Sequence, residues 1–335
     1  MGDVVVRVLA VALVTGLPVA VPAYAAADEG PEKLFTFKDP AITESSGLAV
    51  SPTHDGIYYT HNDSSAAPTF YAVDKNGRTK ATFQLGGAEA RDWEAMAASK
   101  DPATGRGVLW FADIGDNLDG AWPDVSVYRV MEPQTIRDAT LPATRYRFRY
   151  ADGARNAEGI MVHPKTGRLY VVSKEFAGSV YAAPKKLRAN KTNILRKVAS
   201  APIMATDAAY APDGSSYVIR TYFSATLYRP SGEVISRVSM PELKQAESIA
   251  YTLDGKALLT GSEGPRSPVY RVPIPQLAVG APTPTPSPAA AKKKEDEDQT
   301  APASTGGLKL KDILIWLAAA GTAVGVITFI ARRTR

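Results

Sequence analysis

Residues 156–181 contain the clearest copy of a unit that recurs along most of this chain. In this copy, acidic Glu158 precedes a short apolar run, a turn follows at 164–167, a second apolar run at 169–172 leads into polar residues, and a third run ends at Tyr181. Apolar runs of four to six residues bounded by Gly, Pro and Asp are typical of strands joined by hairpins. The unit therefore predicts an all-β domain built from similar hairpins.

Four more copies begin at acidic residues and carry a tyrosine in their third apolar run. Their openings are Glu44, Asp92, Asp207 and Glu247. The tyrosines of the five copies are Tyr71, Tyr128, Tyr181, Tyr228 and Tyr270, which are 57, 53, 47 and 42 residues apart. A period of this size, made of short strands, is typical of a propeller blade. We expect a β-propeller of five blades, each of four antiparallel strands. Six blades would need another blade in the long second interval, where 118–124 is interpreted as a loop insertion.

The fourth strand of a blade follows the tyrosine in the first four copies but not in the fifth. These strands are expected at 81–85, 146–150, 194–198 and 234–238. Proline follows the fifth copy at once, whereas the apolar run at 34–37 precedes the first copy and has no repeat of its own. We expect residues 34–37 to pair with the last blade and close the ring, because an open sheet edge invites aggregation.

Both ends of the chain have the composition of targeting or anchoring segments. Residues 1–26 combine Arg7, an apolar run and a small-residue site at 23–25, which is typical of a secretory signal. Residues 313–331 are uncharged, long enough to cross about 30 Å of hydrocarbon as one transmembrane helix, and followed by arginines that favour the cytoplasmic side. The predicted segments are a signal peptide (1–26), a propeller ectodomain (27–276), a Pro-, Ala- and charge-rich linker (277–307), and an anchor with a short basic tail (308–335).

These segments predict a single-pass protein of the cell membrane with the propeller outside the cytoplasm. The sequence Pro-Ala-Ser-Thr-Gly at 302–306, followed by an apolar run and arginines, also resembles the signal that sortases cut between Thr and Gly. Pro302 stands where that signal has leucine. Retention in the membrane is therefore favoured, with sortase attachment to the cell wall as the alternative.

Charge and cysteine content exclude several classes of function. The chain has no cysteine, which excludes disulfide and thiolate chemistry. Its formal net charge is +5, but residues 27–280 contain 30 Lys and Arg against 28 Asp and Glu. Because the globular part is nearly neutral, no nucleic-acid partner is indicated.

The start of the first strand and the end of the second should lie on one rim of the ring, because the two strands are antiparallel. This rim should hold the acidic openings and the polar residues that end the second strands, with Glu44, Glu175 and Arg155 among them. The residues expected to bind a ligand there are His61, Asp63, Arg91, Asp92, Glu94, Glu158, Lys174, Asp207, Arg220, Glu247 and Glu263.

Two interpretations of this rim remain open. Oxygen ligands favour a divalent ion such as calcium, the cations would hold an anionic group, and paired carboxylates can do acid–base work. The repeated acids can instead hydrogen-bond backbone amides and lock neighbouring blades, an interpretation favoured for Glu158, Asp207 and Glu247 because a structural group is needed in every blade. His61 is the one imidazole on the expected rim, as a base, a ligand or a partner of a neighbouring strand.

A separate oxygen-rich segment, Asp-Ile-Gly-Asp-Asn, occupies residues 113–117. It supplies the candidate metal ligands Asp113, Asp116 and Asn117, although its spacing does not match an EF-hand loop. The chain has no G-x-S-x-G elbow, no HExxH and no phosphate-cradling Gly loop, so the common hydrolase routes lack support.

The Glu-Ser-Ser-Gly-Leu-Ala and Glu-Ser-Ile-Ala openings at 44 and 247, with the returns at 62–64 and 113–117, resemble extracytoplasmic propellers of the phytase-related, esterase-like type. They are also similar to the WD-repeat-like surface proteins of high-GC Gram-positive (actinobacterial) bacteria, although Asp92-Trp93 reverses the Trp-Asp order. The resemblance covers residues 34–273. It implies a calcium-assisted phosphoesterase or a binding platform.

Two functions follow from these observations. The first is a membrane-anchored binding module whose rim engages an extracellular ligand: a wall polymer, a protein or a small molecule. The alternative is a calcium-dependent hydrolase of phosphate esters or lactones that uses the same rim. The binding module is favoured, because repeated residues account for most of the polar positions and no nucleophile stands out.

Overall fold

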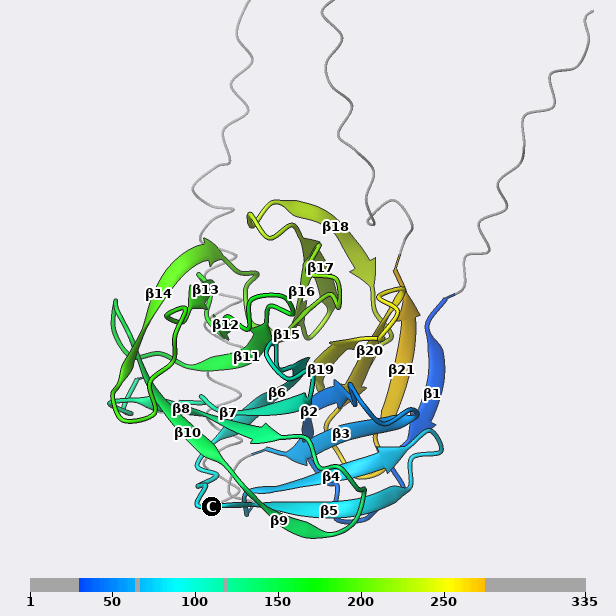
Figure 1. Cartoon of the computed structure of the whole chain (residues 1–335). Coiled ribbons are helices and arrows are strands. Elements are labelled where there is room, and N and C mark those ends of the chain that lie inside the picture. The colour runs from blue at the N-terminus through cyan, green and yellow to red at the C-terminus, as the bar shows by residue number, and fades with distance from the viewer. Residues whose placement is uncertain (1–29, 64–66, 117–119, 275–335) are drawn as a thin grey trace, which may run out of the picture. The chain divides into compact units, whose positions relative to one another are not determined.

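The computed structural model describes residues 30–63, 67–116 and 120–274, and their fold is all-β (Figure 1). The chain divides into two units, Met1–Ala281 and Pro282–Arg335, and the second lies outside the described residues. The predicted signal peptide, linker and anchor also lie outside them. Within the described ranges, no helix has the length and apolar character needed to span a membrane.

The described strands form five sets, and in each set the first four strands named pair in antiparallel order. Set 1 contains β2 (Ser45–Val50), β3 (Ile57–Asn62), β4 (Thr69–Asp74) and β5 (Thr79–Gly86), to which β9 (Ala139–Pro142) adds in parallel. Set 2 contains β6 (Trp93–Lys100), β7 (Gly107–Asp113), β8 (Val125–Met131) and β10 (Thr144–Tyr150). Set 3 contains β11 (Ala157–Val162), β12 (Leu169–Ser173), β13 (Ser179–Ala182) and β14 (Asn193–Ser200).

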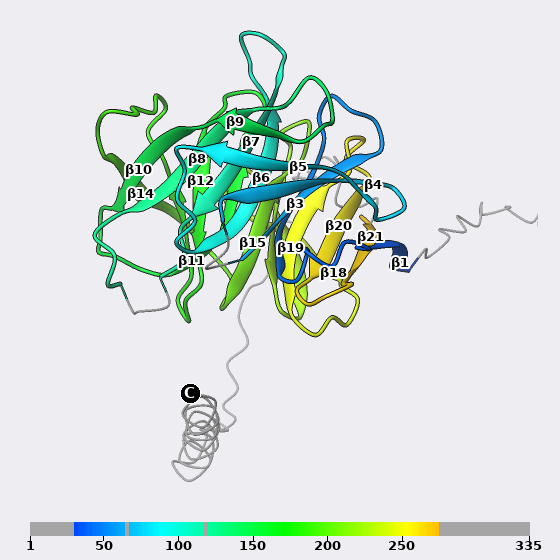
Figure 2. The same cartoon turned by 90° about the horizontal axis from the view of Figure 1, so that it is seen from below.

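The last two sets complete the fold. Set 4 contains β15 (Ala205–Tyr210), β16 (Tyr217–Thr221), β17 (Ser224–Tyr228) and β18 (Val234–Ser239). Set 5 contains β19 (Ala246–Tyr251), β20 (Ala257–Ser262), β21 (Pro268–Pro273) and β1 (Glu32–Thr36). The outer strands β10 and β14 pair in parallel, so sets 2 and 3 share one continuous sheet (Figure 2).

The first strands of the five sets lie side by side at the centre of the fold (Figure 1). In chain order, β2, β6, β11, β15 and β19 each contact the next, and β19 contacts β2 again. Apolar clusters fill the space between successive sets; Tyr59, Trp93 and Phe111, for example, belong to one cluster contributed by sets 1 and 2. This closed arrangement is β-propeller-like, and the inner strands border its central channel.

A glycine with positive φ lies in the turn between the first and second strand of every set. These glycines are Gly56, Gly105, Gly167, Gly214 and Gly255. Residues with a Cβ rarely adopt this backbone conformation, so glycine permits the tight reversal. The turns mark one face of the ring, and the opposite face carries the start of each first strand and the end of each second strand. We call this opposite face the mouth.

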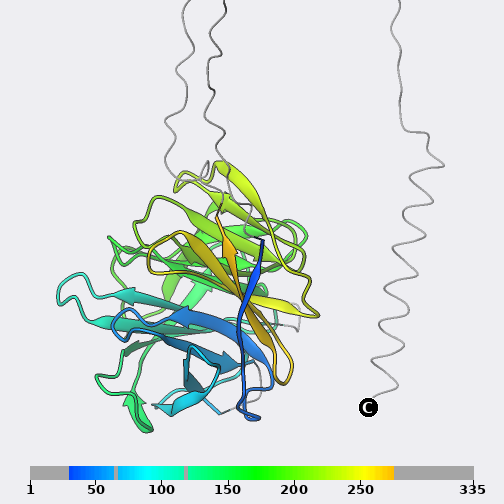
Figure 3. The same ribbon diagram turned by 90° about the vertical axis from the view of Figure 1, so that its right-hand side faces the viewer.

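The predicted closure by the N-terminal run is confirmed. Strand β1 pairs antiparallel with β21, with Glu32 opposite Arg271 and Thr36 opposite Pro268. Figures 1 and 3 show the first described strand, in dark blue, beside the last, in gold. The chain therefore begins and ends its ring in the same set, on the face opposite the mouth.

The expected fourth strands and tyrosine positions are also confirmed. Strands β5, β10, β14 and β18 cover the predicted fourth-strand runs, and the five tyrosines lie on β4, β8, β13, β17 and β21. One element was not predicted. Residues 139–142 form β9, which pairs with the outer edge of β5 and so ties the long second interval back to set 1.

Candidate functional site

Every inner strand has a register shift close to its first residue. The first residues inside these five shifts are Ser46, Glu94, Glu158, Thr206 and Glu247, and the shift in β19 also encloses Ser248. A β-bulge re-aims a side chain relative to the regular pleat. Three of these five side chains are glutamates, and each is buried. The bulges therefore gather carboxylates at the mouth of the channel.

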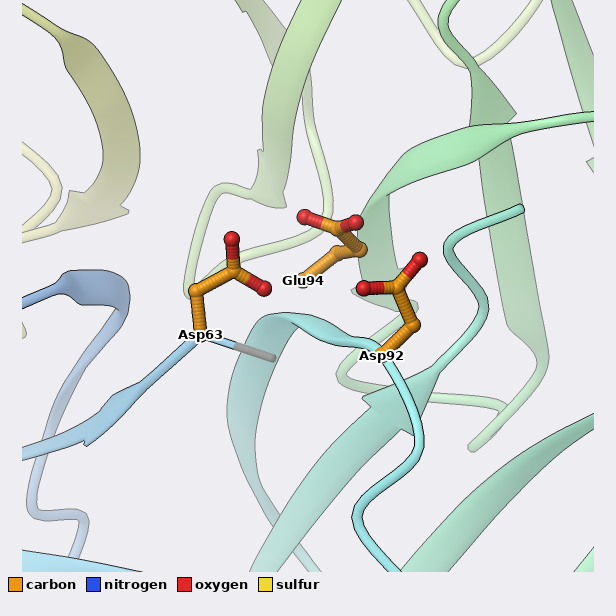
Figure 4. A group of neighbouring side chains, drawn as sticks. All are labelled: Asp63, Asp92 and Glu94. Atoms are coloured by element: carbon orange, nitrogen blue, oxygen red, sulfur yellow. The ribbon is translucent and has the colours of Figure 1, made fainter. Parts of the chain in front are cut away.

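Asp63, Asp92 and Glu94 form the tightest group of carboxylates at the mouth (Figure 4). One oxygen atom from each lies within 4.8 Å of the others. Asp63 directly follows β3 of set 1, whereas Asp92 and Glu94 come from the start of β6 in set 2. The group thus depends on the contact between two neighbouring sets, and we call it the carboxylate trio.

Electrostatic repulsion and burial raise the pKa values of the acids around the trio. Burial, followed by the charges of Glu158 and Asp63, raises the pKa of Glu94 far above its ordinary value. Burial raises the pKa of Glu158 to about 7. The pKa of Glu263 is raised to about 8, first by burial and then by the charge of Glu247. In the absence of a bound cation, Glu94 and Glu263 therefore favour the protonated form near neutral pH.

Within the part of the chain that the structure describes, Lys174 places a positive charge at this acidic mouth. Its Nζ donates to Glu158 Oε1 at 2.8 Å, and it lies 5.2 Å from the centre of the Tyr222 ring. Burial alone would lower the pKa of Lys174, but the charge of Glu158 outweighs it and raises that pKa. The Glu158 carboxyl also accepts from Asn156 Nδ2 at 3.4 Å. Glu158 is therefore held by side chains, and it does not serve as a backbone lock.

The segment at 113–116 supports the trio from behind. Asp113 Oδ1 accepts from the backbone N–H of Asp92 at 2.8 Å, and the N–H of Gly115 donates to the Asp92 carbonyl at 3.2 Å. A Cβ on Gly115 would collide with carboxylate oxygens of Glu94 and Asp92. This oxygen-rich segment therefore holds Asp92 in position. Residue 115 must be glycine because a larger residue would not fit beside the carboxylates.

The candidate metal ligands of that segment have other partners. Asp116 Oδ2 accepts from the N–H of Trp122 at 2.9 Å, and its own N–H donates to Asn156 Oδ1 at 2.8 Å. Asn117 lies outside the described residues. In the described ranges, the group of acids close enough to share an ion is the carboxylate trio, and it does not include Asp113 or Asp116.

Two of the predicted cations lie away from the trio. Arg91 donates to the carbonyl of Asp124 at 3.2 Å and stacks 4.2 Å over Trp122. Arg155 forms ion pairs with Asp152 and Glu175, both at 3.1 Å. Both guanidinium groups therefore interact with residues of loops beside the mouth.

His61 and Arg220 are fully buried between sets, and not exposed on the rim. The His61 ring packs edge-on against Trp93, with 5.5 Å between ring centres, and burial lowers its pKa. Burial also lowers the pKa of Arg220 to about 10, opposed by the charges of Glu247 and Asp207. The physical reason is register: both residues pair with inner-strand positions just past the bulge, where side chains face the next set.

Asp207 differs from the glutamates with which the sequence groups it. Its carboxylate accepts from the backbone N–H groups of Ala208 at 2.7 Å and Ile249 at 2.8 Å. It lies one residue past the bulge, which Thr206 occupies. Asp207 thus performs the locking role that repetition suggested, whereas Glu158 does not.

Several mouth residues have no strong sequence signal. Asn156 and Gln245 occupy the position two residues before the bulge that Glu44 and Asp92 occupy in other sets. Gln245 Nε2 donates to Glu263 Oε2, and Tyr222 faces Lys174. Asn156 and Gln245 lie two residues before Glu158 and Glu247, so counting back from those glutamates would have found them.

The opposite end of the channel is apolar. A cavity of about 400 Å³ opens there, lined by all five inner strands through residues that include Leu48, Met96, Met161, Ala208, Ile249 and Leu253. The channel therefore has one carboxylate-rich end and one apolar end.

The donor set at the mouth fits a hard divalent cation such as calcium. Such ions take carboxylate oxygens as ligands, and they stabilise acids that otherwise repel one another. A further buried atom, Glu247 Oε2, makes no hydrogen bond to any described residue. A positive charge at the mouth would stabilise the ionised form of Glu94 and would attract this unsatisfied oxygen of Glu247.

Comparisons with known proteins concern the fold. No protein-family model matches the chain, and no curated protein matches it. Among solved structures, the chain is similar to a gluconolactonase from Xanthomonas campestris, with a TM-score of 0.43 and 17% identity. That match covers 65% of this chain and 69% of the other. The resemblance to phytase-related and actinobacterial surface propellers stays a prediction.

Proposed function

We propose that the protein is a divalent-cation-dependent hydrolase of phosphate esters or lactones, with its active site at the mouth. The observation that supports this most directly is the carboxylate trio, whose oxygens lie within 4.8 Å of one another beside a Glu158–Lys174 pair. We also propose that the ring counts as five blades, since five inner strands form its closed centre. Extracytoplasmic location and membrane anchoring are proposed from the sequence alone.

Asp63, Asp92 and Glu94 would hold the cation. A bound divalent cation supplies Lewis-acid polarisation of a carbonyl or phosphoryl oxygen and lowers the pKa of a coordinated water. Glu158 is suited to take or give a proton, because its pKa of about 7 lies near the working range of an acid–base group. Lys174 keeps that carboxyl oriented through the 2.8 Å contact and offers positive charge to an anionic substrate.

The test begins with cation binding by the full-length protein. After chelator treatment, calorimetric titration with Ca²⁺, Mg²⁺ and Mn²⁺ should show one strong site in the wild type. Glu94→Gln should lose at least tenfold in affinity, since it removes a charged ligand from the trio. Asp55→Asn is the matched control, because Asp55 is an exposed acid in a turn on the opposite face.

Turnover is then measured with p-nitrophenyl phosphate and with γ-butyrolactone in a pH-stat. Hydrolysis that requires the added cation and is lost in Glu158→Gln supports the hydrolase. Cation binding without turnover of either class supports the binding module that uses the same mouth. Absence of any cation site in the wild type would overturn both versions of a metal-dependent mouth.

A further inference from the structure

Both exposed phenylalanines among the described residues lie on the rim of the mouth. Phe176 is 85% exposed and Phe223 is 90% exposed. Phe176 belongs to the loop between β12 and β13, and Phe223 to the turn between β16 and β17. Ile203, 52% exposed, belongs to the connection from β14 to β15, on the same face. We call Phe176, Ile203 and Phe223 the rim apolar patch.

Hydrogen bonds hold the backbone under this patch. The N–H of Met204 donates to the Glu175 carbonyl at 3.0 Å, and that of Ala201 donates to the Gly178 carbonyl at 2.8 Å. In the neighbouring turn, Thr221 Oγ1 accepts from the N–H groups of Phe223 at 3.3 Å and Ser224 at 3.1 Å. The loops are therefore fastened while their large apolar side chains face solvent. Large apolar side chains held exposed on one rim are a feature of ligand-binding surfaces.

Two residues of the patch closely follow, in the chain, the side chains that contact each other at the mouth. Lys174 and Tyr222, which contact each other at the mouth, are two residues before Phe176 and one residue before Phe223. A ligand whose head contacts Lys174 therefore has Phe176 and Phe223 within two residues of the contacting pair. The two surfaces differ in chemistry, one charged and rich in oxygen, the other apolar.

We propose that the site takes an amphiphilic substrate, with an oxygen-rich phosphate or lactone head at the mouth and an alkyl or aryl tail over the rim apolar patch. This inference rests on the proposed cation site and adds the class of substrate. A membrane surface is the alternative occupant of the patch, and the experiment distinguishes it from a soluble amphiphile. The tail gains affinity by covering the phenylalanine rings.

The experiment measures binding, so it does not depend on turnover. Methyl-, butyl-, hexyl- and octylphosphonate are titrated calorimetrically into the full-length, Ca²⁺-loaded protein. Affinity should rise about twofold for each added methylene, which is half of what complete burial would give. The double variant Phe176→Ser/Phe223→Ser should bind methylphosphonate as the wild type does and show no dependence on tail length.

Leu253→Ser is the matched control, since Leu253 is an exposed apolar residue, 56% exposed, on the opposite face. It should keep the wild-type dependence on tail length. The proposal is overturned if no phosphonate binds, if affinity is independent of tail length in the wild type, or if the dependence survives in the double variant. Protection of the backbone amides of Phe176 and Phe223 from hydrogen exchange by phosphatidylcholine vesicles, but not by octylphosphonate, would overturn it in favour of membrane contact. Tail-dependent binding without hydrolysis would contradict the hydrolase but support this inference.

Discussion

The carboxylate of Asp207 on β15 accepts a hydrogen bond from the backbone N–H of Ile249 on β19 at 2.8 Å, and so joins the inner strands of two neighbouring sets. Thr206, one residue earlier, donates from Oγ1 to the Ala246 carbonyl at 3.0 Å. Ser46 makes the same kind of bond to the Glu94 carbonyl. Side chains at the bulges thus fasten one set to the next where the channel has no regular sheet pairing.

Replacing Asp207 by alanine should lower the free energy of unfolding by about 3 to 5 kcal/mol. The change leaves the buried N–H groups of Ala208 and Ile249 without their acceptor, and each unsatisfied buried donor costs about 1 to 3 kcal/mol. Urea unfolding of the full-length protein measures the effect, with Asp55→Ala as the exposed control. A loss below 1 kcal/mol would contradict the locking role.

The identity of Asp207 also shows where the sequence pattern stops being informative. Hairpin runs, turn glycines and spaced tyrosines predict the sets and their closure by β1, because strand formation and turn geometry are local. Grouping the openings by acidic character, however, equates Asp207 with Glu158. Their positions differ by one residue, and in a strand one residue exchanges the two faces. Acidic character alone cannot detect that difference.

The mouth itself follows from antiparallel pairing, but the carboxylate trio does not. Pairing places Asp63 and Asp92 on one rim, as predicted from the ends of their strands. Their approach across two sets depends on ring closure and on the bulge at Glu94, which are not local properties. Of the segment predicted to supply metal ligands, Asp113 and Gly115 hold Asp92 in place through hydrogen bonds and do not join the trio.

Gly115→Ala should weaken divalent-cation binding by tenfold or more while leaving the fold intact. A Cβ at this position meets the carboxylates of Glu94 and Asp92, so one of them must move. Calorimetric titration with Ca²⁺ measures the change. Gly30→Ala, where the added Cβ meets nothing within 4 Å, is the matched control. Equal affinities for the two variants would exclude Glu94 and Asp92 as ligands.

In the cation-free protein, Glu263 should make stability fall as pH rises. Its pKa is raised to about 8 in the folded state, above the ordinary 4.5. Between those values the folded state keeps a proton that the unfolded chain has lost, so the contribution is full below 4.5 and is lost as pH rises through 8. Because Glu263 is only partly buried, we expect the free energy of unfolding to fall by about 1 kcal/mol over this pH range. Melting in chelator from about pH 5 to pH 8.5 tests this.

Glu263→Gln is the variant for that series, since it cannot titrate and keeps a similar shape. Its melting temperature should depend less on pH than that of the wild type, and its advantage should be largest at the alkaline end. Identical pH slopes for the two proteins would mean that Glu263 titrates normally in the folded state.

Lys174→Met should change cation and anion binding in opposite directions. Lys174 carries positive charge 2.8 Å from Glu158 and beside the carboxylate trio, so it opposes a divalent cation and favours an anionic head group. Its removal should strengthen Ca²⁺ binding about threefold, the size of a partly screened charge contact, and weaken methylphosphonate binding by a similar factor. A purely structural role would weaken both, because a loosened mouth holds neither ion well. Lys174→Arg, which keeps the charge, should restore phosphonate binding toward the wild-type value. Parallel losses in the methionine variant, without recovery in the arginine variant, would show that Lys174 supports the fold of the mouth and does not contact the substrate.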